Sequence, residues 1–177
     1  CQPAEIARQV WETYQPQLEH RGFARRLQID QDVPQVEGDC QAIAQAIINL
    51  LDNAVKYSDR DRYVELRVRR GISQDRAAAV IEVIDHGMGL SESQRSRIFE
   101  AFYRVPQRGG SPVAGSGLGL AIVNHIVRSH GGTIEVDSAP AAGSTFRLIF
   151  PASPDEQPAG QPDEGGADDG KNPDRRR

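Results

Sequence analysis

The sequence contains only two cysteines, Cys1 and Cys40, among its 177 residues. They form no spaced set of metal ligands, and they are too few for a disulfide framework. This scarcity is typical of proteins from a reducing compartment, so we expect a cytoplasmic location. Cys40 is interpreted as an ordinary packing residue of a helix.

Long hydrophobic runs and concentrated positive charge are also missing. No apolar stretch approaches the roughly 20 residues needed to cross a bilayer, and no signal peptide is visible. The net charge is −4, and no long face gathers Lys and Arg. We therefore expect no nucleic-acid partner and no membrane contact from this chain. The first residue is Cys rather than Met, which suggests a fragment of a longer protein and leaves open a membrane anchor elsewhere in that parent.

Residues 152–177 contain no large apolar residue and are rich in Pro, Gly and acidic groups. Such a segment cannot offset the entropy lost on ordering, so it predicts a disordered tail. Residues 1–151 are then expected to form a single domain.

Helical and strand patterns alternate along residues 1–151. Apolar residues recur at helical spacing in residues 4–23, with a kink expected at Pro16 and an end signal at Gly22. Later segments alternate apolar and charged residues, as in residues 62–70, where Val64 and Leu66 would point inward and Glu65 outward. Strands with one apolar face indicate a sheet covered by helices on one side only. The sequence thus predicts an α/β two-layer sandwich with a mixed, mostly antiparallel sheet and helices on one face.

A helix predicted over residues 39–58 has two distinct faces. One broad arc is apolar, whereas Asn49, Asn53 and Lys56 project together from another face. Amide oxygens beside a cation suit Mg²⁺ together with phosphate. The alternative is a solvent-exposed face with an Asp52–Lys56 ion pair.

Asp85 ends a strand on the same side as the apolar Ile81 and Val83. A carboxylate facing the covered layer is costly without a donor, and a purine amine would supply one. Gly87 and Gly89 would let the backbone approach a flat ring. Alternatively, Asp85 merely caps the turn that follows it.

A glycine-rich segment, Gly115 to Gly119, directly precedes an amphipathic helix. Such loops expose backbone N–H groups to anions, although this spacing matches neither a P-loop nor a dinucleotide-binding fingerprint. Residues 105–116 are interpreted as a mobile lid over the cavity. The aromatic residues before it, Phe99, Phe102 and Tyr103, are interpreted as core.

Four stretches in this order, "NLLDNAVKYS", "DHGMGL", "FEAFYR" and "GSGLGLAIV", resemble the N, G1, F and G2 boxes of sensor histidine kinases. These kinases belong to a wider ATP-binding superfamily with gyrase, Hsp90 and MutL. The resemblance extends over about residues 3–151. It implies a Bergerat-type ATP-binding fold with ATP and Mg²⁺ as cofactors.

The resemblance also implies roles for individual residues. Asn53 matches the Mg²⁺ ligand, with Asn49 supporting phosphate or metal, and Asp85 matches the group that binds the adenine amine above the turn of Gly87 and Gly89. Arg104 is expected to reach the terminal phosphate, so Asn49, Asn53, Lys56 and Arg104 form the expected catalytic set. The remaining residues expected to contact nucleotide are Tyr57, Gly115, Ser116, Gly117, Leu118, Gly119 and Leu120.

The position matched by Asn49 usually carries a Glu general base in hydrolases of the superfamily, and Asn cannot take up a proton at neutral pH. The resemblance therefore implies transfer of the γ-phosphoryl group to a histidine. No histidine here lies in the H-[ED]-x-x-[PT] setting of an acceptor, so the expected partners are the dimerisation helices of the parent kinase and a response regulator. The isolated domain is expected to be monomeric. A nucleotide-binding regulatory module without turnover and an ATPase remain alternatives.

Overall fold

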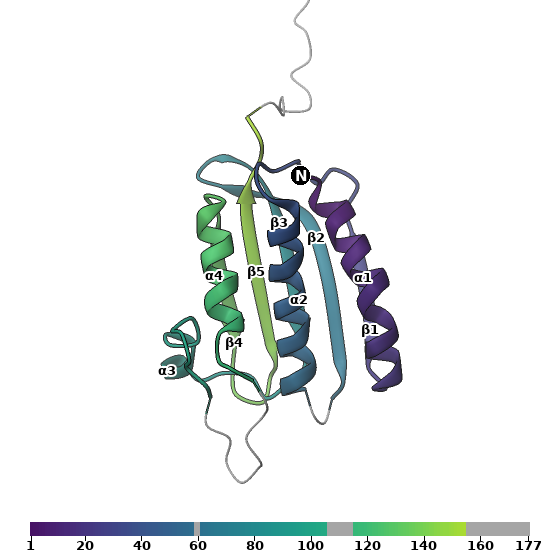
Figure 1. The fold of residues 1–177 in the computed structure, drawn as a ribbon, viewed down its shortest axis with the longest axis vertical. Coiled ribbons are helices and arrows are strands. Elements are labelled where there is room, and N and C mark those ends of the chain that lie inside the picture. Colours follow the sequence, from purple (N-terminus) through teal and green to yellow (C-terminus); the bar gives the residue numbers. More distant parts are fainter. Residues whose placement is uncertain (59–60, 106–114, 155–177) are drawn as a thin grey trace, which may run out of the picture.

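The computed structural model describes residues 1–58, 61–105 and 115–154. Its helices and strands follow one another along the chain in an order that begins with a helix and ends with a strand (Figure 1). In sequence they are α1 Pro3–His20, β1 Ala24–Ile29, α2 Cys40–Tyr57, β2 Tyr63–Ser73, β3 Arg76–Asp85, α3 Glu92–Arg95, α4 Gly119–Ser129, β4 Thr133–Ser138 and β5 Ser144–Pro151.

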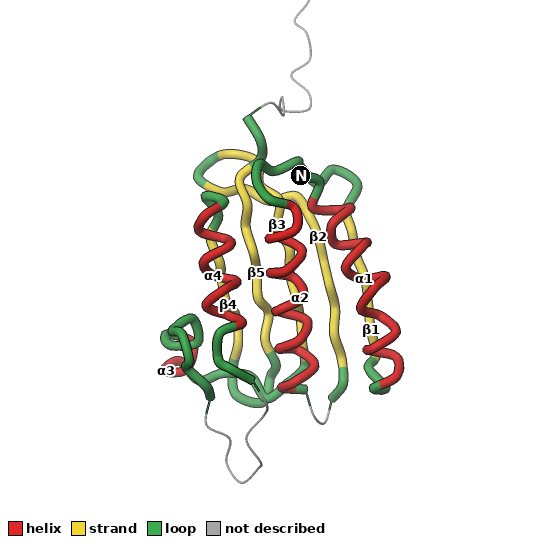
Figure 2. The backbone as a smooth tube through the Cα atoms, in the orientation of Figure 1, coloured by secondary structure: helices red, strands yellow, loops and turns green. Residues whose placement is uncertain are grey.

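The strands form one five-stranded sheet in the order β1-β2-β3-β5-β4. β1 runs parallel to β2, and the other neighbouring pairs are antiparallel. The helices α1, α2 and α4 lie side by side on one face of this sheet (Figure 2). The predicted two-layer sandwich with a mixed, mostly antiparallel sheet is therefore confirmed.

The central helix α2 buries its apolar face against the sheet. Ile43, Ile47 and Leu51 are fully buried. The helix begins after Asp39, whose carboxylate accepts hydrogen bonds from the backbone N–H groups of Gln41 and Ala42. Such an N-cap satisfies donors that have no partner within the helix. The helix predicted over residues 39–58 is thus confirmed, and its apolar arc faces the core.

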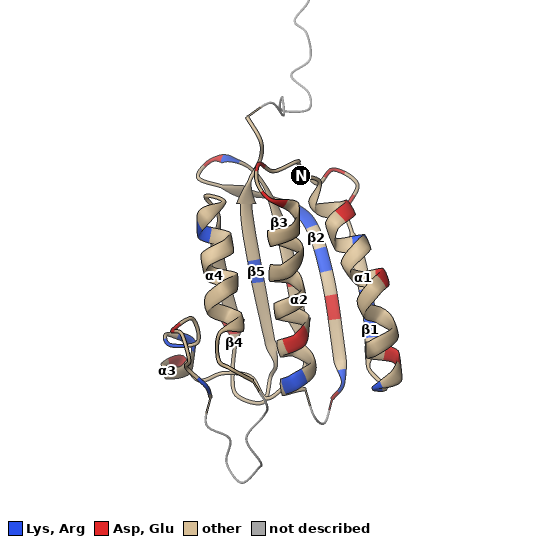
Figure 3. Cartoon of the chain, in the orientation of Figure 1, with Lys and Arg blue, Asp and Glu red and all other residues tan. Residues whose placement is uncertain are grey.

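The sheet face turned away from the helices is covered by ion pairs. Glu65 and Glu82 point outward as the alternation predicts, yet they are only 4% and 3% exposed. Arg67 bonds Glu65 at 2.9 Å, and Arg69 and Arg147 bond Glu82 at 3.0 and 3.1 Å. Charged residues follow β2 and recur on β5 (Figure 3). Arginine side chains therefore shield this face, where the sequence predicted only exposed charges.

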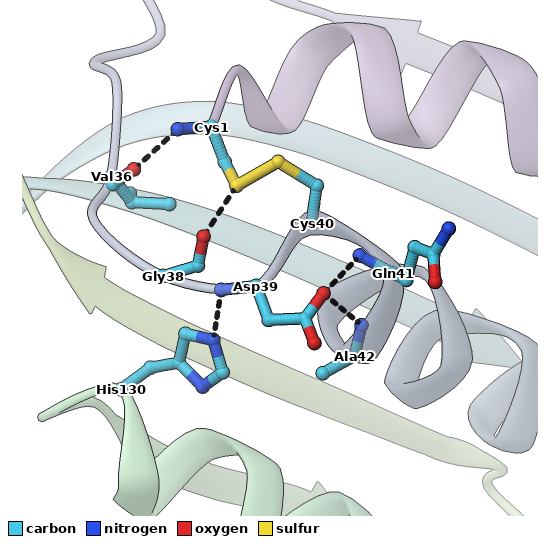
Figure 4. Close-up of a disulfide and its surroundings, with 8 residues drawn as sticks. All are labelled: Cys1, Val36, Gly38, Asp39, Cys40, Gln41, Ala42 and His130. Atoms are coloured by element: carbon cyan, nitrogen blue, oxygen red, sulfur yellow. Dashed lines mark hydrogen bonds between the residues drawn. A yellow bond between two sulfur atoms is a disulfide. The ribbon is translucent and has the colours of Figure 1, made fainter.

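Cys1 and Cys40 are joined by a disulfide, with their Cα atoms 5.6 Å apart (Figure 4). The interpretation of Cys40 as an ordinary packing residue was wrong, and the argument for a reducing compartment falls with it. The cause is tertiary: α1 and α2 pack side by side, so Cys1, two residues before the start of α1, meets the first residue of α2. Two cysteines 39 residues apart give no local signal of this proximity.

A histidine from α4 reaches the same end of α2. The Nε2 atom of His130 accepts a hydrogen bond from the backbone N–H of Asp39 at 2.9 Å, and its Nδ1 atom lies 2.7 Å from the carbonyl oxygen of Ile126 (Figure 4). With Nε2 accepting, Nδ1 carries the proton and donates it to Ile126. His130 thus joins the C-terminal end of α4 to the start of α2.

None of the helices within the described ranges is long and apolar enough to cross a membrane.

Candidate functional site

A cavity of about 300 Å³ lies where α2, the turn after β3 and the beginning of α4 meet. Its lining includes parts of all four stretches that the sequence singled out. Of the predicted site residues, those that line it are Asn49, Asn53, Lys56, Tyr57, Asp85, Gly89, Arg104, Gly115, Ser116, Gly117, Leu118, Gly119 and Leu120.

Gly87 is the predicted site residue that does not line the cavity. Its backbone N–H donates to Oδ1 of Asp85 at 2.7 Å. A Cβ atom at this position would lie 2.6 Å from the carbonyl oxygen of Tyr57, closer than side chains tolerate. Gly87 therefore shapes the turn that holds Asp85 and leaves no room for a side chain between that turn and α2.

Asp85 lies at the end of β3 and is 7% exposed. Burial raises the pKa of its carboxyl to about 6, although backbone hydrogen bonds from Gly87 and Ser144 and the nearby His86 act in the opposite direction. The carboxylate caps the turn that follows it and also lines the cavity, so the two interpretations are compatible, and the contact with a purine amine stays a prediction. At neutral pH it is mostly ionised and can accept a hydrogen bond from a ligand.

The polar stripe of α2 also faces the cavity. Nδ2 of Asn49 is buried without a hydrogen-bond partner, while its Oδ1 accepts from Gln45 at 3.4 Å. Lys56 forms no ion pair with Asp52 among the described residues, and Asp52 instead accepts a hydrogen bond from the Tyr14 hydroxyl at 2.7 Å. The Asp52–Lys56 ion pair of the alternative interpretation was therefore wrong, whereas Lys56 itself is exposed, as that interpretation expected.

These groups fit a magnesium ion bound together with phosphate. A buried amide donor without a partner can donate to a phosphate oxygen, and Asn49 offers one such donor in the cavity that the cation of Lys56 also lines. The amide oxygen of Asn53 is a ligand type that Mg²⁺ accepts alongside phosphate oxygens. The donor set is thus compatible with the cofactors that the sequence predicts.

The glycine-rich segment contacts the backbone of Phe102 on one side and approaches α2 on the other. The N–H of Phe102 donates to the carbonyl oxygen of Gly117 at 3.0 Å. Gly117 has a φ of +74°, and a Cβ atom there would lie 2.8 Å from the Phe102 backbone. A Cβ atom on Gly119 would lie 4.0 Å from Nδ2 of Asn53. The start of α4 therefore lies next to the polar stripe of α2.

Phe102 is 73% exposed, so its interpretation as core was wrong. Its backbone has a φ of +66°, and the hydrogen bond from its N–H holds it beside Gly117, with its side chain largely exposed. Phe99 and Tyr103 do pack partly against the core. Most of the predicted lid, residues 106–114, lies outside the described residues.

Sequence reasoning missed several residues that line the cavity. Asp52 lies on α2 three residues after Asn49, so helical spacing alone was a usable signal. Ser144 and Phe146 come from β5, and only the pairing of Ser144 with Asp85 across the sheet brings them there. No local motif indicates that pairing. The other lining residues that were not predicted are Met88, Leu90, Ile98, Tyr103, Val105 and Ile122.

The four histidines lie away from the cavity lining. Nδ1 of His86 lies 2.8 Å from the Asp61 carboxylate, and its ring stacks on Tyr63. His130 joins α4 to α2, as described above. His125 is exposed on α4, and His20 ends α1.

Comparison with known proteins gives a consistent result. Residues 38–154 match the family of histidine kinase-, DNA gyrase B-, and HSP90-like ATPases. The sensor-like histidine kinase SenX3 of Mycobacterium tuberculosis is 40% identical over 130 residues, which cover 71% of this chain and 30% of SenX3. The adaptive-response sensory kinase SasA of Crocosphaera subtropica is 35% identical over 146 residues, or 82% of this chain and 37% of SasA. The chain thus spans about a third of the length of these curated relatives.

Solved structures agree with these sequence relatives. The mycobacterial sensor histidine kinase MprB matches with a TM-score of 0.67 and 29% identity, over 83% of this chain and 92% of the MprB chain. Full-length ShkA in complex with AMPPNP matches with a TM-score of 0.69 and 29% identity, over 84% of this chain and 29% of ShkA. The catalytic domain of the histidine kinase ThkA has a TM-score of 0.70 at 23% identity, which supports the fold.

Proposed function

Because the chain belongs to the family of histidine kinase-, DNA gyrase B-, and HSP90-like ATPases, we propose that it is the ATP-binding catalytic domain of a two-component sensor histidine kinase. It transfers the γ-phosphoryl group of ATP to a histidine on the dimerisation helices of its parent, which then passes the group to a response regulator. One observation carries the proposal: the amides and cation of α2, the buried Asp85 and the glycine-rich start of α4 line a single cavity.

The adenine end of the site is built around Asp85. Its carboxylate is held by backbone N–H groups and is ionised above about pH 6, so it accepts a hydrogen bond from the purine amine. Apolar residues line the same cavity and suit a flat ring, as is usual for nucleotide sites. They are Met88, Leu90, Ile98 and Phe146.

The phosphate end combines side-chain and backbone donors. Lys56 supplies a cation, and the unpartnered Nδ2 of Asn49 supplies a donor. No side chain caps the start of α4, so its first N–H groups and the positive end of its dipole are available to an anion. Asn53 would hold Mg²⁺, which neutralises phosphate charge when bound. Arg104 lines the cavity and is proposed to contact the terminal phosphate.

The choice of transfer over hydrolysis rests on Asn49. Its side-chain amide cannot accept a proton from water at neutral pH, so a hydrolytic water has no general base at this position. An imidazole is itself a nucleophile and does not need that base. The acceptor is proposed to lie outside this chain, since its own histidines have other contacts or lie away from the cavity.

Phosphorylation of the parent kinase with γ-labelled ATP tests this function. The expected product is an acid-labile, alkali-stable phosphohistidine on the dimerisation helices, and Asn53→Ala should lower its rate of formation at least about tenfold. Asn124→Ala is the matched control, because Asn124 lies on α4 but does not line the cavity. Binding of ATP without phosphohistidine would favour a regulatory module. Fast release of inorganic phosphate by the unmodified protein would favour an ATPase.

A further inference from the structure

Asp52 is a cavity-lining carboxylate with no role in the proposed function. It lies on α2 between Asn49 and Lys56 and lines the same cavity as both. Asp85 is the other carboxylate among the described lining residues, and it accepts hydrogen bonds from Gly87 in the turn after β3 and from Ser144 at the start of β5. Asp52 instead places a negative charge on the helix whose amides and cation we assign to phosphate and magnesium.

Tyr14 of α1 fixes the position of this carboxylate. Its hydroxyl donates to Oδ1 of Asp52 at 2.7 Å. Burial, followed by the hydrogen bond to Asp52, raises the pKa of Tyr14 above its ordinary value, so the hydroxyl stays a donor across the physiological range. Tyr14 itself does not line the cavity. The carboxylate is therefore anchored from behind by one oxygen.

The second oxygen of Asp52 is uncommitted. No hydrogen bond or ion pair to Oδ2 occurs among the described residues, including the nearby Lys56. Oδ2 is also absent from the buried unpartnered atoms in the part of the chain that the structure describes, so it is open to solvent or ligand. The negative charge of Asp52 can therefore interact electrostatically with a ligand that enters the cavity.

A fixed carboxylate repels a bare triphosphate and attracts its counterion. Metal-free ATP carries roughly twice the negative charge of its magnesium complex, so the repulsion falls when the metal is bound. We infer that Asp52 makes nucleotide binding at this site depend on magnesium, because it disfavours metal-free ATP relative to Mg-ATP. This inference rests on the proposed ATP-binding function and assigns Asp52 a selective role within it. Asp52 is a positioning and selectivity residue, and the reacting atoms need not touch it.

Calorimetric titration of ATP against the protein tests this role. The dissociation constant is measured once with EDTA and once with excess Mg²⁺, and the ratio of the two constants reports magnesium dependence. Asp52→Asn removes the charge but keeps an oxygen that can accept from Tyr14. The ratio should fall about fivefold or more at moderate ionic strength, chiefly because metal-free ATP binds more tightly.

Tyr14→Phe is the matched control, because it removes the hydrogen bond while keeping the charge of Asp52. Its ratio should remain within about threefold of the unmodified protein even if the variant is less stable. A ratio for Asp52→Asn within about threefold of the unmodified value would overturn the inference, and so would an equal fall in Tyr14→Phe. Failure of the unmodified protein to bind ATP under either condition would instead overturn the proposed function, and the inference with it.

Discussion

The fold and the proposed ligand favour opposite protonation states of the Asp85 side chain. Burial favours the neutral carboxyl, whereas an adenine amine needs an ionised acceptor. The N–H groups of Gly87 and Ser144 reduce the conflict without removing it, because the pKa stays near 6. Removing the charge of Asp85 should therefore raise the stability of the fold and lower the affinity for nucleotide.

The stability of the folded domain should depend on pH through Asp85. Its folded pKa of about 6 exceeds the ordinary value of 3.8, so the folded state binds more protons than the unfolded state between these values. The free energy of unfolding contributed by this group therefore falls as pH rises through that window, by up to about 3 kcal/mol. Urea denaturation at pH 5 and pH 7.5 measures about half of this change, roughly 1.4 kcal/mol, because pH 5 already lies inside the window between the two pKa values. Asp85→Asn should lose it and be the more stable protein at pH 7.5; identical pH dependence in both proteins would contradict the argument.

Nucleotide binding should respond to Asp85 in the opposite direction. Asp85→Asn replaces the acceptor proposed to bind the purine amine with a group that can present a donor, so Mg-ATP affinity at pH 7.5 should fall about tenfold or more. In the unmodified protein, affinity should also fall as pH drops below about 6. Calorimetry checks both effects. Asp61→Asn is the control, because Asp61 is exposed, pairs with His86 and does not line the cavity. Undiminished affinity in Asp85→Asn would exclude this role.

At the scale of elements, α2 has separate structural and ligand-binding ends. Its first turn is held by the Cys1–Cys40 disulfide and by the contact of His130 with Asp39. Its last two turns carry Asn53 and Lys56. Changes at the first end should therefore alter stability more than nucleotide affinity.

Removing the disulfide tests this separation. In the chain-entropy description, a link across 39 residues stabilises the folded state by about 4 kcal/mol at most. The double variant Cys1→Ser, Cys40→Ser should therefore unfold at a lower urea concentration than the unmodified protein. In the presence of reductant, the unmodified protein should unfold at nearly the same urea concentration as the double variant. The affinity of the double variant for Mg-ATP under folding conditions should differ from that of the unmodified protein by less than about threefold. Equal stability of the two proteins would show that the link adds nothing to the fold.

The turn after β3 depends on glycine for steric reasons. Gly89 has a φ of +63°, and a Cβ atom there would lie 1.9 Å from the carbonyl oxygen of Ala139. Gly22 has a similar φ of +70°, but a Cβ atom there would meet nothing within 4 Å. Gly22→Ala should therefore cost about 1 kcal/mol for its backbone conformation alone. Gly89→Ala should cost clearly more, as measured by thermal denaturation; equal losses would mean that the close approach to Ala139 is unimportant.

At the scale of the whole molecule, the periodicity of apolar residues along the sequence predicted the helical layer and the sheet. The apolar arc of α2, the alternation in β2 and β5 and the inward side of Asp85 depend only on local geometry, so each could be predicted from neighbouring residues. The same local geometry placed Asn49, Asn53 and Lys56 on one face, and all three line the cavity.

Long-range pairing explains what the sequence could not predict. Ser144 enters the site because β5 pairs with β3, and Cys1 meets Cys40 because two helices pack together. Glu65 was predicted to be exposed, since alternation gives the side of a residue but not what covers it. Arginines from the same and neighbouring strands cover it. Such contacts depend on strand order and helix packing, which no single segment encodes.

The disulfide closes residues 1–40 into a covalent ring that contains α1 and β1. A tension applied at the amino terminus would therefore divide at Cys1, with one path along α1 and the other directly into the first turn of α2. Because α2 also carries the amides and the lysine of the cavity, the ring gives mechanical load a short route to the helix that we propose binds the nucleotide. In the reduced protein that load would reach α2 only along the chain of α1 and β1 and through the non-covalent packing of α1 against α2.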